Sequence, residues 1–108
     1  MGHGSLGEFE HLVLLATLHL GADAYGVSVA EFIEERTGRR VNQAATYLTL
    51  RRLEEKDLVQ SSMGEPTPER GGRAKRLFAL TESGVVQLRE KREELLAMWE
   101  GIPESLGP

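Results

Sequence analysis

The sequence predicts a mainly helical domain with a small antiparallel β-hairpin, followed by one more helix. Three observations support this fold class. Apolar residues recur at helical spacing in four segments, 8–20, 23–37, 42–57 and 82–102. Two short segments, 58–62 and 73–80, have the pattern of strands, and the loop that joins them is rich in Gly and Pro. Three helices, a hairpin and a further helix, in this order, indicate a winged helix-turn-helix with a C-terminal extension.

The composition narrows the possible classes of protein. A chain of 108 residues fits one domain. Cysteine is absent, which excludes disulfides, thiolate metal sites and cysteine nucleophiles. No apolar run approaches the ~20 residues of a membrane span, and no basic segment precedes the apolar run near the N-terminus as in a signal peptide. We therefore expect a cytoplasmic protein that does not contact a membrane.

The first helix is expected over residues 8–20, after a Gly-rich and flexible start at 1–7. Apolar residues cover most of its circumference, so it should be buried on more than one side. Gly21 ends this helix.

The start of the second helix is less sharply marked than its end. Asp23 is a possible N-cap, and Ser28 with Glu31 also spells a capping box, so the helix begins at Asp23 or at Tyr25. It ends at Thr37, because Gly38 follows.

The third helix follows Asn42, a good N-cap, and ends at Asp57. Its inward stripe is predicted from three residues at spacings of three, Tyr47, Leu50 and Leu53. The opposite face then consists of Ala44, Ala45, Leu48, Thr49 and Arg52. This face is flat, made of small residues and ends in arginine, which suits insertion into a DNA groove.

The last helix begins at Thr81 or Glu82. It carries a heptad-like stripe, interrupted only by an arginine: Val85, Leu88, Arg92, Leu95, Trp99 and Ile102. Roughly 18 helical residues make a rod about 27 Å long. A narrow apolar stripe of this kind, on a helix at the end of a small domain, favours packing against a helix of a partner.

The charge is unevenly distributed, although the net charge of −4 argues against a nucleic-acid partner at first sight. Residues 1–35 carry six acidic side chains and no Lys or Arg, whereas residues 36–52 carry five arginines and no acid. A second basic cluster lies in the hairpin, at residues 65–76. Local clusters set the electrostatic field at a binding surface, so the third helix and the hairpin remain candidates for contact with DNA.

Four motifs in order closely resemble the PadR family of winged-helix transcriptional regulators. They are GEFEHLVLLATL in the first helix, Ala24-Tyr25-Gly26-Val27 at the second, TYLTLRRLEEKDLV in the third, and the hairpin GEPTPERGGRAKRLFALTESG. The resemblance runs from Gly7 to about Ile102. It implies a DNA-binding domain at 8–83, a dimerisation helix at 84–102 and a tail at 103–108, as in the short form of the family with one C-terminal helix.

The resemblance further implies a homodimer that binds a two-fold symmetric DNA operator, most often as a repressor. Family dimers form mainly where the C-terminal helix packs against the N-terminal region of the partner. The residues expected at this interface are Phe9, Leu12, Leu88, Leu95, Trp99 and Ile102. Some family members bind planar aromatic effectors at the dimer centre, where Trp99 could stack on such a compound or act simply as a packing residue.

Three residues depart from the family pattern. Asp57 stands where glycine usually takes a positive φ, and we expect it to adopt that conformation at a cost of around 1 kcal/mol. Thr46 replaces an inward-facing apolar residue, and Leu77 replaces an aromatic residue of the second strand.

Residue chemistry suggests a role for each DNA-facing side chain. Arg52 can pair with guanine and Gln43 with adenine, while Thr49 can reach a base or a phosphate. Leu48 could meet a thymine methyl group, and the hydroxyl of Tyr47 could reach a phosphate. The remaining cations suit phosphate contacts, which give affinity and register: Arg51, Arg70, Arg73, Lys75 and Arg76. The alternative for each residue is an ordinary solvated position.

The other functional classes receive less support from the sequence. His11 and His19 lie eight residues apart without a third ligand, so no metal site or other cofactor is predicted. No nucleophile has a neighbouring base, and no phosphate-binding loop is present, so an enzyme is not expected. The main alternative is a winged-helix module that binds a protein through a surface around Leu48 and Trp99 and does not bind DNA.

Overall fold

The computed structural model describes residues 6–66 and 74–104. In chain order the elements are α1 (Glu8–Leu20), a 3₁₀ turn η1 (Gly21–Asp23), α2 (Gly26–Thr37), α3 (Gln43–Glu55), β1 (Val59–Met63), β2 (Arg76–Leu80) and α4 (Glu82–Trp99). The predicted fold class, mainly helical with one antiparallel hairpin, is confirmed. Residues 1–5 of the flexible start predicted at 1–7, and most of the tail predicted at 103–108, lie outside the described residues. Leu6, within the predicted flexible start, is buried against the core.

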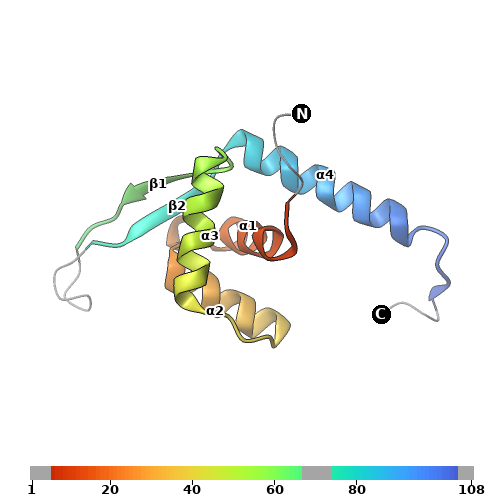
Figure 1. Ribbon diagram of the computed structural model, residues 1–108, viewed down its shortest axis with the longest axis horizontal. Coiled ribbons are helices and arrows are strands. Elements are labelled where there is room, and N and C mark those ends of the chain that lie inside the picture. Colours follow the sequence, from red (N-terminus) through yellow and green to blue (C-terminus); the bar gives the residue numbers. More distant parts are fainter. Residues whose placement is uncertain (1–5, 67–73, 105–108) are drawn as a thin grey trace.

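The three N-terminal helices surround the core, with the hairpin and α4 extending from it in opposite directions (Figure 1). The longest dimension is therefore 53 Å and the shortest 20 Å. The core is formed by buried side chains from the four helices and both strands, including Val13, Leu14, Val29, Ile33, Leu50, Leu53, Val59, Phe78 and Leu88. Among the described residues no helix is long and apolar enough to cross a membrane.

The start of α2 agrees with the later of the two predicted positions, but its capping differs from both predictions. Its N-cap is Tyr25, whose backbone N–H donates to Ser28 Oγ over 2.9 Å. Asp23 instead lies in the 3₁₀ turn, where its carbonyl accepts a hydrogen bond from the same hydroxyl. Ser28 therefore caps the helix by closing this turn, and Glu31 remains exposed without a capping role.

The rotation of α3 is the main correction to the sequence analysis. Its buried residues are Thr46, Thr49, Leu50 and Leu53, and Tyr47 is only half-buried. Residues spaced by three are each displaced by about 60° around a helix, so a stripe of such residues does not stay on one face. Tyr47, at one end of the predicted stripe, therefore lies off the buried face. The two buried hydroxyls are satisfied within the helix, Thr46 by Asn42 O at 2.9 Å and Thr49 by Ala45 O at 2.8 Å.

The turn after α3 places the hairpin against the end of the helix. Asp57 has φ 64°, which confirms the left-handed conformation expected from the sequence. Thr81 ties the turn to the start of α4, because its hydroxyl donates to Asp57 O over 2.7 Å and its N–H donates to Leu58 O over 3.0 Å. β1 and β2 pair in register from Val59–Leu80 to Met63–Arg76. The hairpin is thus fixed at its base to both α3 and α4.

The last helix is shorter than the predicted stripe. α4 ends at Trp99, and Gly101 has φ 89°. Ile102 therefore lies beyond the helix and does not continue its stripe of apolar residues.

A partly buried ion pair connects the start of α1 with the end of α3. The carboxylate of Glu10 accepts two hydrogen bonds from Lys56 Nζ, at 3.1 and 2.9 Å, and one from the N–H of Gly7. Burial raises the pKa of Glu10, but the hydrogen bonds from Gly7 and Lys56 outweigh this effect, so its pKa lies below the usual 4.5. The ionised carboxylate of Glu10 therefore stabilises the fold.

We expect Glu10→Gln to lower the free energy of unfolding at pH 7 by about 1–2 kcal/mol, because Lys56 loses a charged acceptor. Since the pKa of Glu10 is lowered in the folded state, its contribution is present above pH 4.5 and is lost as the pH falls below it. Urea titrations at pH 7, 5, 4 and 3 should show the two proteins converging in acid. A constant difference across this range would contradict the prediction.

Candidate nucleic-acid interface

The exposed face of α3 is the first part of the candidate site. Asn42 begins the helix by accepting the N–H of Ala45 through its side chain, at 2.8 Å. Beyond this cap, the solvent-facing side is formed by Gln43, Ala44, Ala45, Leu48, Arg51 and Arg52. Leu48 is 60% exposed and is the large apolar side chain of this face. Small side chains with a terminal arginine leave room for this helix to approach a base-pair edge.

Thr49 does not belong to this face. Its side chain is buried and its hydroxyl is bonded to Ala45 O, so the expectation that it points toward DNA was wrong. The prediction failed because the core packs against the side of α3 that carries Thr46, Thr49, Leu50 and Leu53.

Tyr47 joins the helix to the neighbouring elements. Its ring packs edge-on against Phe78 of β2, with centroids 6.1 Å apart, and lies against Gly26 at the start of α2, where an added Cβ would come within 3.4 Å. Its hydroxyl accepts a hydrogen bond from Arg51 Nη1 over 3.1 Å. This hydrogen bond, and to a smaller extent the nearby charge of Arg76, lower the pKa of Tyr47. Tyr47 is thus held by packing and has its hydroxyl in a cationic environment.

A chain of polar contacts continues from Arg51 to the hairpin. Arg51 Nε lies 3.3 Å from Glu54 Oε1. Glu54 Oε2 accepts a hydrogen bond from Ser61 Oγ of β1 over 2.7 Å. Ser61 Oγ in turn accepts a hydrogen bond from Arg76 Nη1 of β2 over 3.0 Å. Two of the predicted phosphate-binding arginines are therefore oriented by one carboxylate and one hydroxyl. The sequence analysis missed Glu54 and Ser61, although the spacing of Arg51 and Glu54 is typical of a helical ion pair.

A hollow of about 260 Å³ opens between α2, α3 and β2. It is lined by Tyr25, Gly26, Val27, Gln43, Ala44, Tyr47 and Arg76. Lys75 lies at its edge, with Nζ 4.4 Å from the centre of the Tyr25 ring. The predicted contacts Gln43, Tyr47, Lys75 and Arg76 are thus brought together around one concave surface. The other two predicted hairpin contacts, Arg70 and Arg73, lie outside the described residues.

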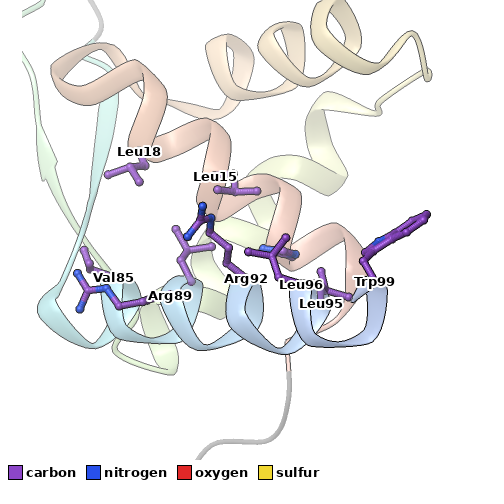
Figure 2. Close-up of a pocket in the computed structure, with 10 residues that line it drawn as sticks. Leu15, Leu18, Val85, Arg89, Arg92, Leu95, Leu96 and Trp99 are labelled. Atoms are coloured by element: carbon purple, nitrogen blue, oxygen red, sulfur yellow. The ribbon is translucent and has the colours of Figure 1, made fainter. Parts of the chain in front are cut away.

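A second surface lies on the other side of α1. Its apolar groove of about 520 Å³ runs between α1 and α4, and Figure 2 shows the side chains of both helices converging on it. We call it the α1/α4 groove; it is lined by His11, Leu15, Leu18, Val85, Leu88, Arg89, Arg92, Leu95, Leu96 and Trp99. Leu18, Leu96 and Trp99 are each more than half exposed. A large exposed apolar surface of this kind is typical of an interface.

Five of the six predicted dimer residues lie in this groove or against the core, and the sixth, Ile102, lies beyond the end of α4. Leu88, Leu95 and Trp99 line the groove. Phe9 and Leu12 pack against the core instead, and the guanidinium of Arg39 lies 5.9 Å from the centre of the Phe9 ring.

Comparison with protein families gives one match, the transcriptional regulator PadR-like family, over residues 14–90. The matched range contains the second half of α1, all of α2 and α3, the hairpin and half of α4. The chain belongs to this family. The resemblance seen in the sequence is thereby confirmed, and PadR-family proteins are transcriptional regulators.

Several solved structures, of two PadR-type regulators and of RosR, share the fold. A PadR-family transcription regulator from Clostridium difficile R20291 is 28% identical, with a TM-score of 0.68 over 90% of this chain and 98% of that one. RosR from H. salinarum is 26% identical, with a TM-score of 0.66 over 92% of this chain and 82% of that one. A PadR-like regulator from Bacillus cereus, 16% identical, matches in fold with a TM-score of 0.72 over 93% of this chain and 92% of that one. Comparison with curated sequences gives no match.

Proposed function

We propose that this PadR-family protein is a sequence-specific DNA-binding repressor that acts as a homodimer on a two-fold symmetric operator in the cytoplasm. The observation that carries the proposal is the exposed face of α3, with Arg52 at its end, beside the cationic side of β2. A helix of this shape fits the major groove, and the neighbouring cations suit the phosphates that flank it.

The chemistry of each side chain supports a particular contact. Arg52 is exposed on α3 and can pair bidentately with guanine. Gln43, in the first turn, can pair with adenine, and Leu48 can contact a thymine methyl group. Arg51, Lys75 and Arg76 flank this face and supply phosphate contacts. The same role is proposed for Arg70 and Arg73 from their charge alone, because both lie outside the described residues.

An electrophoretic shift titration with the protein's own promoter region tests the proposal. We expect a discrete complex whose affinity falls steeply as the salt concentration rises, because phosphate contacts release counterions. A random duplex of equal length should bind at least about 10³-fold more weakly at physiological salt. Equal binding of both duplexes, or an affinity indifferent to salt, would refute the DNA-binding function.

The homodimer rests on the α1/α4 groove. Its apolar side chains come from two helices that leave them exposed, and a second copy related by two-fold symmetry would cover them. Such a dimer would place the two α3 helices in successive major grooves, about 34 Å apart. Derepression would follow if a ligand at the dimer centre changed this spacing.

Replacing Trp99 by alanine should weaken the dimer at least about tenfold, as measured by sedimentation equilibrium, because Trp99 is a large aromatic side chain in the groove. Met98 provides a matched control, since it is 75% exposed on the same turn but does not line the groove. Met98→Ala should leave the dimer nearly unchanged. Equal effects of the two substitutions, or a wild-type monomer at micromolar concentration, would exclude this interface.

A planar aromatic effector could stack on Trp99 within the same groove. Titration with a panel of planar aromatic compounds should then quench or shift the fluorescence of Trp99, the only tryptophan of the chain. If no compound changes the fluorescence, the effector loses its support and Trp99 is a packing residue of the dimer.

A protein-interaction module is the second candidate, and the exposure of Leu48 favours it. This function would depend on apolar contacts, so binding of the partner would resist salt. It would also survive the loss of arginines on α3 and β2, which distinguishes it from DNA binding.

A further inference from the structure

Glu54 is a feature that the proposed DNA binding does not explain. Its carboxylate lies among the cations of the candidate interface, 3.3 Å from Arg51 Nε. Each negative charge on such a surface repels the phosphates and lowers the general attraction to DNA. A surface selected only for affinity would carry a neutral residue at this position.

The two oxygens of the Glu54 carboxylate face different elements of the fold. Oε1 faces Arg51, three residues earlier on α3. Oε2 accepts a hydrogen bond from the hydroxyl of Ser61 on β1, at 2.7 Å. The hydroxyl oxygen of Ser61 in turn accepts a hydrogen bond from Arg76 Nη1 of β2, at 3.0 Å. The Glu54 side chain is 30% exposed, so these contacts are partly shielded from water. One acidic side chain thus links α3 with both strands of the hairpin.

We propose that Glu54 is a positioning residue for DNA recognition, which fixes the orientation of the hairpin relative to α3 and so raises the discrimination between DNA sequences while lowering the general attraction to DNA. The inference rests on the proposed DNA-binding function. Base contacts from α3 require placement to within about 0.5 Å, whereas phosphate contacts from Arg76 are available on any duplex. A fixed angle between the two elements lets both sets of contacts form together only on a matching site.

The bridge also restrains the two arginines themselves. Arg51 donates to Tyr47 and faces Glu54, and Arg76 donates to Ser61, so both guanidiniums are oriented before DNA arrives. Without the carboxylate, both side chains gain freedom to turn toward the nearest phosphates. The protein would then bind unrelated DNA more tightly and its operator less well.

Glu54→Gln tests this inference, with Glu55→Gln as its matched control. Glu55 is the next residue of α3 and is exposed, and both substitutions change the net charge by the same amount. The probes are a duplex selected by the wild-type protein from a random library and a scrambled duplex of equal composition. Their dissociation constants are measured over a range of KCl concentrations.

We expect Glu54→Gln to lower the ratio of the affinity for the selected duplex to the affinity for the scrambled duplex about tenfold. The scrambled duplex should bind more tightly and the selected duplex less tightly. The slope of log K against log salt for the scrambled duplex should become steeper by about 0.9 for each arginine that gains a phosphate. Glu55→Gln should strengthen both complexes slightly and leave the ratio unchanged. A purely structural role of Glu54 would reduce the active fraction equally for both duplexes, which also leaves the ratio unchanged.

Ser61→Ala provides a second test that alters no charge and does not depend on the folding of the Glu54 variant. It should lower the ratio about threefold, whereas Ser62→Ala, at the next and exposed position of β1, should not. Equal ratios for the Glu54 and Glu55 variants, or for the Ser61 and Ser62 variants, would overturn the inference while wild-type discrimination persists. Failure of the wild type to discriminate would instead overturn the proposed function.

Discussion

Replacing Arg52 and Arg76 together by alanine is expected to reduce affinity for the operator at least about 30-fold. Each side chain can contribute about 1–3 kcal/mol, Arg52 through a bidentate contact with guanine and Arg76 through a phosphate. The two losses should nearly add, because the residues lie on different elements and are expected to reach different parts of the duplex.

The single variants separate the two roles. Arg52→Ala should relax the preference for one base pair, whereas Arg76→Ala should weaken binding to all duplexes and lower the salt slope by about 0.9. The measurement is a fluorescence anisotropy titration with the selected duplex and with four single-base variants of it.

A charge-matched control removes two cations away from α3 and the hairpin. Arg36 lies at the end of α2, over the Phe32 ring, and Lys91 pairs with Glu94 on α4. Replacing both by alanine should change affinity for the operator less than about threefold. If this control loses as much affinity as the Arg52 and Arg76 variant, net charge controls binding and the assigned interface is wrong.

Gly84→Ala is expected to cause the largest loss of stability, about 3 kcal/mol or more. Gly84 is buried in the first turn of α4, and an added Cβ would lie only 2.2 Å from the carbonyl oxygen of Leu58. This oxygen belongs to the backbone and accepts the N–H of Thr81, so it cannot move aside without breaking the junction of β1 and α4.

Thermal unfolding followed by circular dichroism measures this loss, which should lower the melting temperature by at least about 10 °C. Gly7→Ala is the matched control, since the nearest atom to its added Cβ is a side-chain oxygen 3.8 Å away. This variant should unfold within about 3 °C of the wild type. Equal stability of the Gly84 variant and the wild type would show that the junction relaxes freely.

The sequence predicted most elements of the fold because local chemistry sets their limits. The bounds of α1, at Glu8 and Leu20, and the cap at Asn42 follow from residues within one helical turn. The left-handed Asp57 followed from the glycine that the family carries there. Family membership was likewise readable from motifs that are continuous in the sequence.

The tertiary structure decided which faces meet, and this the sequence did not predict correctly. A helix of mixed small and polar residues such as α3 has no sharp apolar stripe, so its rotation is set by the core that packs against it. For this reason Thr46 and Thr49 are buried, with their hydroxyls bonded to the helix backbone.

The sequence by itself therefore determined the order of the elements and the residue types that can touch DNA. Only the tertiary structure brought Glu54 of α3 within hydrogen-bond distance of Ser61 on β1, and Ser61 within reach of Arg76 on β2. The physical reason is that caps and turns act over a few residues, whereas contacts between Glu54, Ser61 and Arg76 depend on how the helix and the hairpin pack in space.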